Sequence, residues 1–289
     1  MNLIKSKYVP YLFLLPAGLI LIVFFFYPLL EVFRLSFTKY NIVRPAEYIG
    51  LDNFRTLFKD PLFWKTLKNS IIYLIGVVPP LVFIPIFLAI LVNNQIRGIS
   101  FFRALFYLPV VISIVVTGIA WKWLYSENGP LNYLVTSLHI SHDKLNWLSD
   151  PKLALFSVMA VTIWRGLGYY MVIYLAGLQA IPKELYEACE IDGAGFLQKH
   201  LFITIPLLKS SIVFVAVVSS INALKVFVEI FIMTNGGPAY NSATIVQYLY
   251  QKAFEDLNLG YACALGLVMF VLTFIFSLAN IKAIEKNWQ

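Results

Sequence analysis

Six stretches long and apolar enough to cross a membrane constrain this chain more than any other feature of its sequence. A spanning helix needs about 20 mostly apolar residues, because the hydrocarbon core of a bilayer is ~30 Å thick and a helix rises ~1.5 Å per residue. The stretches lie at about residues 8–30, 69–96, 104–122, 153–178, 206–233 and 257–281. The sequence therefore predicts an all-α, polytopic membrane protein whose six transmembrane helices form a single domain over residues 1–289.

The composition excludes a water-soluble protein. Of the 289 residues, 60% are hydrophobic and 13% are charged, against roughly 45–50% and about 25% in a soluble domain. So little polar surface cannot cover a soluble fold or keep a chain disordered in water. The net charge of +7 is not gathered into a basic cluster, so we expect no nucleic-acid partner and attribute the charge to topology and membrane lipid.

The first stretch follows Lys5 and Lys7, as the apolar part of a secretory signal would. It is longer than the roughly 7–15 apolar residues of a signal, and no small-residue cleavage site follows it, so we expect a retained helix. In the second stretch, Pro79, Pro80 and Pro85 predict a kink or break near the middle, because proline removes a backbone donor and clashes with the preceding turn.

In the last stretch, Gly260 and Ala264, and Ala262 and Gly266, are pairs of small residues spaced four apart. Such pairs allow a close approach of another helix, either within this chain or in another subunit.

Charge sets the expected orientation only weakly. The long segment between the first two stretches carries many Lys and Arg residues, so counting basic residues does not decide which side faces the cytoplasm. Six spans place both termini on one side, and the segments on that side are shorter and denser in basic residues. We therefore expect cytoplasmic N- and C-termini.

The segment at 181–206 is a long polar stretch on the expected cytoplasmic side. Pro182 suits the first position of a helix, and Gly193 and Gly195 suit its end with positive φ. The predicted short helix is acidic, with Glu184, Glu187, Glu190 and Asp192. A helix lying on a lipid surface would be rich in Lys and Arg instead, so this one predicts a protein partner.

The same segment carries a family resemblance. Glu187-Ala188-Cys189, then Gly193, then Ile203-Thr204-Ile205-Pro206 resembles the EAA loop of permease subunits of binding-protein-dependent ABC importers. Further matches resemble the carbohydrate-uptake branch, of the maltose and glycerol-phosphate type. They are Trp164, Gly168, Ala176-Gly177-Leu178-Gln179, Ile181-Pro182, Phe227, Glu229, Thr234, Gly236-Gly237-Pro238, Thr244, Gly50-Leu51-Asp52-Asn53-Phe54, Phe101-Phe102-Arg103 and Leu108-Pro109. Two positions depart from the pattern: Cys189 replaces a usual Ala, and His200 stands where the family often has Phe.

This resemblance implies a type I ABC importer permease in the cytoplasmic (inner) membrane of a prokaryote. Such a subunit forms half of the pathway for a sugar, polyol or sugar-like solute. The implied partners are a second, homologous permease, two ATP-binding subunits and an extracytoplasmic solute-binding protein. The residues implied to couple to the ATPase are Glu187, Ala188, Cys189, Asp192, Gly193 and Pro206.

The chain is not expected to be an enzyme. It contains no G-x-x-x-x-G-K-[ST] phosphate-binding loop, so ATP and Mg are expected only in the partner ATPase subunits, and we expect no cofactor here. No catalytic residue is predicted. His139, His142 and Asp143 lack further ligands nearby in sequence, so we interpret them as a solvated loop and not as a metal site.

Polar residues at membrane depth are the candidates for the substrate path, because such groups are costly in lipid and usually face a cavity or each other. They are Arg165, Asn222, Lys225, Glu229 and Tyr170. Lys225 and Glu229, four apart, could instead be a mutually satisfied helical pair, and Arg165 could extend to the interface or pair with Glu229.

Tyr170 belongs to a set of aromatic residues that could stack on a sugar or simply pack, namely Trp164, Tyr169, Tyr170 and Tyr174. The rival class for the whole chain, an ion-coupled secondary carrier or channel, would have broken helices at an internal repeat, and no repeat is visible.

Overall fold

The computed structural model describes residues 9–93 and 97–286. Tyr8 and Ile96, the expected ends of the first two spans, lie outside the described residues, as do Lys5 and Lys7. The chain divides into two compact units, Met1–Pro61 with Leu249–Val271, and Leu62–Tyr248 with Leu272–Gln289. The two units are described separately below.

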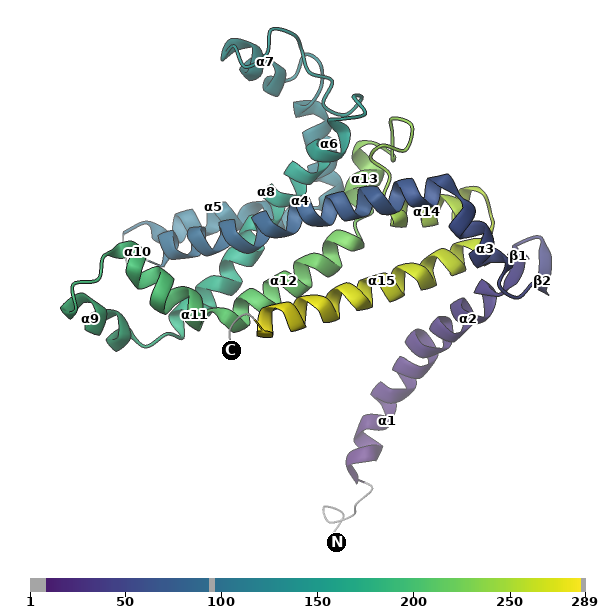
Figure 1. Cartoon of the computed structure of the whole chain (residues 1–289), viewed down its shortest axis with the longest axis horizontal. Helices are drawn as coiled ribbons and strands as arrows, with labels where there is room; N and C mark the ends of the chain where they lie inside the picture. The colour runs from purple at the N-terminus through teal and green to yellow at the C-terminus, as the bar shows by residue number, and fades with distance from the viewer. Residues whose placement is uncertain (1–8, 94–96, 287–289) are drawn as a thin grey trace. The chain divides into compact units, whose positions relative to one another are not determined.

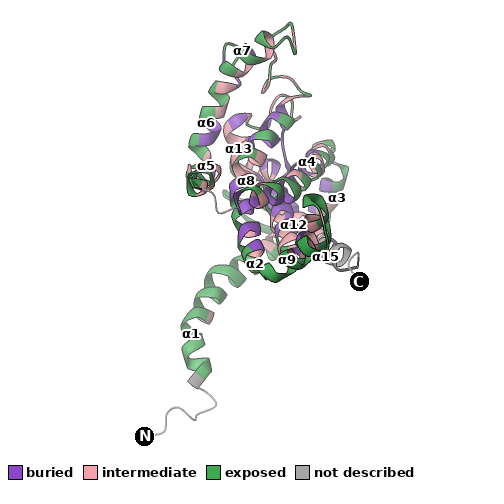
Figure 2. Cartoon of the chain, turned by 90° about the vertical axis from the view of Figure 1, so that its left-hand side faces the viewer, coloured by how far each residue is buried: buried purple, intermediate pink, exposed green. Residues whose placement is uncertain are grey.

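The first unit begins with a long apolar helical run. It consists of α1 (Val9–Leu21), the π-helical turn η2 (Ile22–Phe26) and α2 (Tyr27–Ser36). Nearly all of its side chains are exposed (Figure 2). The antiparallel strands β1 (Thr38–Asn41) and β2 (Arg44–Tyr48) and helix α3 (Asp52–Lys59) follow. The turn η4 (Gln251–Glu255) and the first part of α15 (Leu259–Lys286) also belong to this unit.

Two close contacts hold the first unit together. The buried Asn53 donates hydrogen bonds to the carbonyl oxygens of Ser36 (2.8 Å) and Thr38 (2.9 Å). A Cβ added at Gly260 would lie 2.1 Å from the carbonyl oxygen of Thr38, so only glycine allows this approach. Ala264 is buried as well. The sequence left open whether these small residues pack within this chain or against another subunit. Gly260 packs within this chain.

The second unit contains most of the helices. They are α4 (Pro61–Val92), α5 (Ile99–Val111), α6 (Ile114–Leu124), α7 (Pro130–Ser137), α8 (Ala154–Gln179), α9 (Lys183–Ile191), α10 (Phe196–Lys199), η3 (His200–Thr204), α11 (Ile205–Leu207), α12 (Lys209–Leu224), α13 (Val228–Met233) and α14 (Ile245–Tyr250). Its core is apolar and lies between α4, α8 and α12, where Val77, Val158, Met171 and Val215 are almost completely buried. Helix α5 packs on α8, and α13 packs on α6 and α8.

Of the kink or break predicted for the second stretch, the break is wrong. Helix α4 continues through Pro79, Pro80 and Pro85 as one helix (Figure 1). Proline is tolerated in spanning helices because neighbouring helices and local adjustments compensate for the lost backbone hydrogen bond. Pro85 is itself buried against the core.

The third stretch is two helices and not one. Helices α5 and α6 meet at an angle of 96°, because the backbone of Ile112 and Ser113 is extended (ψ 136° and 135°). A second sharp bend, of 68°, separates Phe196–Leu207 from α12. Within the described residues, four helices are long and apolar enough to cross a membrane, or up to six spans exist if each bent pair counts as one.

Candidate functional site

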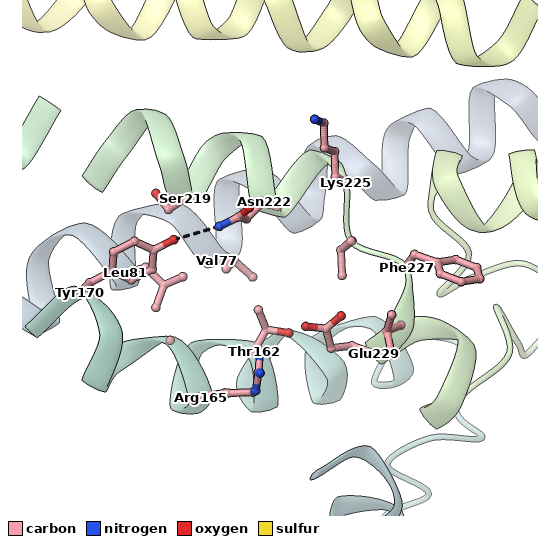
Figure 3. Close-up of a pocket in the computed structure, with 14 residues that line it drawn as sticks. Val77, Leu81, Thr162, Arg165, Tyr170, Ser219, Asn222, Lys225, Phe227 and Glu229 are labelled. Atoms are coloured by element: carbon pink, nitrogen blue, oxygen red, sulfur yellow. Dashed lines mark hydrogen bonds between the residues drawn. The ribbon is translucent and has the colours of Figure 1, made fainter. Parts of the chain in front are cut away.

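A cavity of about 380 Å³ lies among α4, α8, α12 and the segment that leads into α13 (Figure 3). Its lining is mostly polar on the α8 and α12 sides and apolar at α4. The lining residues are Val77, Leu81, Thr162, Arg165, Gly166, Tyr170, Ser219, Asn222, Ala223, Lys225, Val226, Phe227, Val228 and Glu229. The structure therefore brings all five candidate path residues to one cavity.

Helical spacing explains why α8 and α12 supply these groups. Thr162, Arg165 and Gly166 recur three to four residues apart on α8, and so do Ser219 and Asn222 on α12, which places each set on one face of its helix. Sequence reasoning did not name Thr162 and Ser219, and it noted Phe227 only as part of the family resemblance and not as a cavity residue. The first two lie one turn before Arg165 and Asn222, and that spacing was a usable signal.

The chain leaves the helical path at one wall of the cavity. Helix α12 ends at Leu224, and α13 begins only at Val228. The buried hydroxyl of Thr244 donates to the carbonyl oxygen of Val226 at 3.0 Å, which satisfies a backbone group that the break would leave unpaired. Residues 225–227 therefore line the cavity from a non-helical segment.

This break overturns the interpretation of Lys225 and Glu229 as a helical pair. The two residues belong to different segments, and Figure 3 shows the Lys225 ammonium directed away from the Glu229 carboxylate. Among the described residues, no ion pair joins them. Residues four apart form a pair only on one continuous helix, and the chain between Lys225 and Glu229 is not one continuous helix.

Arg165 faces the same cavity as Glu229 without pairing to it. The two side chains point toward one region, with Thr162 between them (Figure 3). The Arg165 Nε atom is buried and has no hydrogen-bond partner. A buried donor left unpaired costs roughly 1–3 kcal/mol. The predicted alternative, a pair between Arg165 and Glu229, is not formed in this conformation.

The aromatic residues of α8 have different surroundings. Tyr170 lines the cavity, and the Asn222 side-chain nitrogen donates to its hydroxyl over a long 3.5 Å. Tyr174 is fully buried in the core, whereas Trp164 lies edge-on to Trp121 at 5.4 Å. Tyr170 is therefore the one of the four that faces the cavity.

The loop after α13 is fixed to α4 by hydrogen bonds. Lys65 Nζ donates to the carbonyl oxygen of Ala239 at 2.6 Å. Asn69 Nδ2 donates to the carbonyl oxygens of Tyr240 and Ala243, both at 2.9 Å, and the Ile245 N–H donates to Ser70 Oγ at 2.9 Å. These contacts bring the loop and Thr244 to their place beside the cavity wall.

The predicted acidic helix is present as α9, but its ends differ from the expectation. Pro182 is the N-cap and not the first helical residue, and Asp192 is the C-cap. Gly193 ends the helix with φ +77°, as predicted. Gly195 does not, because its φ is −73° and it instead caps α10.

The six predicted coupling residues lie along this region. Glu187 and Ala188 are exposed on α9, and Cys189 is half-buried. Asp192 and Gly193 follow directly, and Pro206 begins the return into the bundle in α11. The apolar side chain of Ile191 is 87% exposed, so α9 presents both acidic and apolar groups to its surroundings.

Within the described part of the chain, no group of three or more His, Cys, Asp and Glu side chains is placed to hold a metal ion. His139 and Asp143 lie in the irregular segment after α7.

Apolar helices around a polar cavity, together with an exposed acidic helix, define a multi-pass membrane transport protein. Residues 61–283 match the family described as binding-protein-dependent transport system inner membrane component, and the chain belongs to this family.

Three relatives extend the similarity over almost the whole chain. A probable ABC transporter permease protein, YurN of Bacillus subtilis (strain 168), is 37% identical over 96% of both chains. The arabinooligosaccharides transport system permease protein AraP of the same organism is 33% identical over 96% of this chain and 89% of the relative. The lactose transport system permease protein LacF of Rhizobium radiobacter is 33% identical over 96% and 94%.

The fold is also that of a solved transporter. A bacterial ABC transporter that imports the acidic polysaccharide alginate superposes with a TM-score of 0.85, at 25% identity, over 98% of this chain and 97% of that one. The predicted all-α permease of an ABC importer is thereby confirmed. The alternative of an ion-coupled secondary carrier or channel is wrong.

Proposed function

We propose that this chain forms one half of a membrane pathway for a carbohydrate and couples its import to ATP hydrolysis in separate subunits. The observation that carries the proposal is the cavity. It combines a guanidinium, an ammonium, a carboxylate, an amide, hydroxyls and an aromatic face within about 380 Å³. Hydroxyl-rich solutes need both donors and acceptors at close range, and aromatic rings offer a face to the C–H side of a sugar.

The relatives support the same substrate class. Two of them are named for arabinooligosaccharides and lactose, and the solved neighbour imports a polysaccharide. The proposed path residues are Arg165, Tyr170, Asn222, Lys225 and Glu229.

The proposed partners are a second, homologous permease, two ATP-binding subunits and an extracytoplasmic solute-binding protein. A solved relative was crystallised with a pentasaccharide-bound periplasmic protein. The chain itself has no phosphate-binding loop, so ATP and Mg would be bound by the partners. Residues 187–193 and Pro206 would contact the ATPase on the cytoplasmic side, with both termini on that side.

Reconstitution of the complete complex in proteoliposomes tests this proposal. We expect uptake of an arabinooligosaccharide or of lactose that requires ATP, the ATP-binding subunits and the solute-binding protein together. A liposome without the ATP-binding subunits is the control. Uptake that persists in this control, or that follows an ion gradient, would contradict the proposal.

A further inference from the structure

Helix α9 is attached to the rest of its unit by few side chains. None of its residues is fully buried. Tyr186 is its one aromatic residue, is half-buried, and packs against the hydrophobic core. Glu190 forms an ion pair with Lys199, but Glu190 is largely exposed, and exposed ion pairs contribute little. Tyr186 is therefore the main anchor of α9.

The Tyr186 hydroxyl lies 2.9 Å from Oγ1 of Thr204, and Nδ1 of His200 lies 2.9 Å from the same oxygen. Thr204 is completely buried. All three groups are satisfied when Tyr186 donates to Thr204 and Thr204 donates to an imidazole protonated on Nε2. The Tyr186–Thr204–His200 contact is thus a continuous, partly buried hydrogen-bond network.

This network joins two segments that are otherwise separated by a loop. Tyr186 belongs to α9, whereas His200 and Thr204 are the first and last residues of the π-helical turn η3. Single π-helical turns inside helices often mark functional positions. Thr204 leads into α11 and, beyond the bend at Leu208, into α12, which carries Ser219 and Asn222 at the cavity.

We propose that Tyr186 and Thr204 are positioning residues that transmit displacement of α9 to α12, and that His200 holds the Thr204 hydroxyl in place. This role rests on the proposed function, because α9 is displaced only if it contacts an ATPase. The link bypasses the loop at 192–195, because it connects α9 directly to the buried Thr204 through side chains.

The test compares Tyr186→Phe, Thr204→Val and the double variant in the reconstituted complex. Each single substitution removes one hydroxyl and keeps the shape of the side chain. The readout is the amount of ATP hydrolysed per solute imported in the same vesicles, using whichever of the arabinooligosaccharide or lactose the wild type imports. We expect this ratio to rise roughly 2- to 10-fold in Tyr186→Phe, the factor that one hydrogen bond is worth. The rise in Thr204→Val is expected to be at least as large, because the Thr204 hydroxyl makes two hydrogen bonds.

The double variant is expected to match Thr204→Val, because that substitution already removes the bond to Tyr186 together with the bond to His200. Thr204→Ser, which keeps the hydroxyl, should restore the ratio relative to Thr204→Val. Tyr11→Phe removes a phenol hydroxyl from an exposed position in α1 and serves as the matched control. The quantity of assembled complex, measured by co-purification, corrects for any loss of folding.

A wild-type ratio in both single variants, or strictly additive effects in the double variant, would overturn this role while leaving the proposed function intact. A wild-type complex that shows no ATP-driven uptake would instead overturn the proposed function, and the role of Tyr186 and Thr204 with it.

Discussion

Arg165 occupies a costly position in the cavity. Its Nε atom is buried without a partner, although Glu229 faces the same space. A solute hydroxyl that accepts a hydrogen bond from this charged donor stabilises the bound state, because hydrogen bonds to charged groups are worth about 1.5–3 kcal/mol. Asn222 offers a neutral amide on the other side of the cavity, where one bond is worth about 0.5–1.5 kcal/mol.

We therefore expect Arg165→Ala to weaken the apparent affinity of uptake roughly 10- to 100-fold, and Asn222→Ala roughly 2- to 10-fold. Uptake as a function of the concentration of the loaded binding protein measures both. Arg97→Ala, which removes an exposed cation outside the cavity, is the control. Wild-type affinity and rate in both cavity variants would exclude these residues from the path.

The cavity residues could be predicted because polar groups at membrane depth are few. Arg165, Asn222 and Glu229 stand out in apolar surroundings, and the sequence alone identifies them. Their spatial relation could not be predicted. The break after Leu224 depends on Thr244, which lies far along the chain and bonds to Val226 only in the folded protein.

At the scale of elements, α5 and α8 are held in unusually close contact. A Cβ added at Gly168 would lie 2.1 Å from the carbonyl oxygen of Phe106 and 2.9 Å from Cα of Tyr107. Both atoms belong to the backbone of α5, so no side-chain rotation can relieve the clash. The glycine therefore fixes the distance between the two helices.

Gly168→Ala is expected to destabilise the protein by about 1–3 kcal/mol, the usual cost of overpacking, because the helices must separate. Thermal unfolding of the purified complex in detergent measures the effect. Gly266→Ala is the matched control, because its Cβ would meet only a side-chain atom of Leu249, at an ordinary 3.5 Å. An equal melting temperature for Gly168→Ala and wild type would contradict the close contact.

The elements also show where sequence patterns fail. Apolar length correctly identified the long helix α4, but proline content wrongly predicted a break in it. The bend between α5 and α6 had no such signal, because Ile112 and Ser113 are unremarkable in sequence and adopt extended backbone only in the fold. Hydropathy reports whether a segment suits lipid and not whether it is straight.

At the scale of the whole molecule, α9 is the segment proposed to receive force from an ATPase. Glu187 is exposed on it and is free to meet a basic group of a partner. Replacement by Lys reverses the charge at that contact. Like charges at an interface cost several kcal/mol, and an exposed position tolerates the change within the chain itself.

Glu187→Lys should therefore abolish the stimulation of ATP hydrolysis by the loaded binding protein, while membrane insertion of the subunit stays normal. ATPase activity and the quantity of membrane-inserted subunit are measured side by side. Lys183→Glu, at the first residue of the same helix, tests whether any charge reversal in α9 has this effect. Full stimulation in Glu187→Lys would refute the assignment of this contact.

The hydrogen bond from Thr244 to Val226 has a consequence for exchanging segments between relatives. The loop at 234–245 is fastened to α4 by Lys65, Asn69 and Ser70, and through Thr244 it also fixes where α12 ends. A chimaera that takes the loop at 234–245 from one relative and its cavity helices from another would separate partners that bond to each other. A junction in the loop at 192–195 keeps the Thr244–Val226 bond within one parent but separates Lys65, Asn69 and Ser70 from the loop at 234–245, so residues 61–70 have to be exchanged together with that loop.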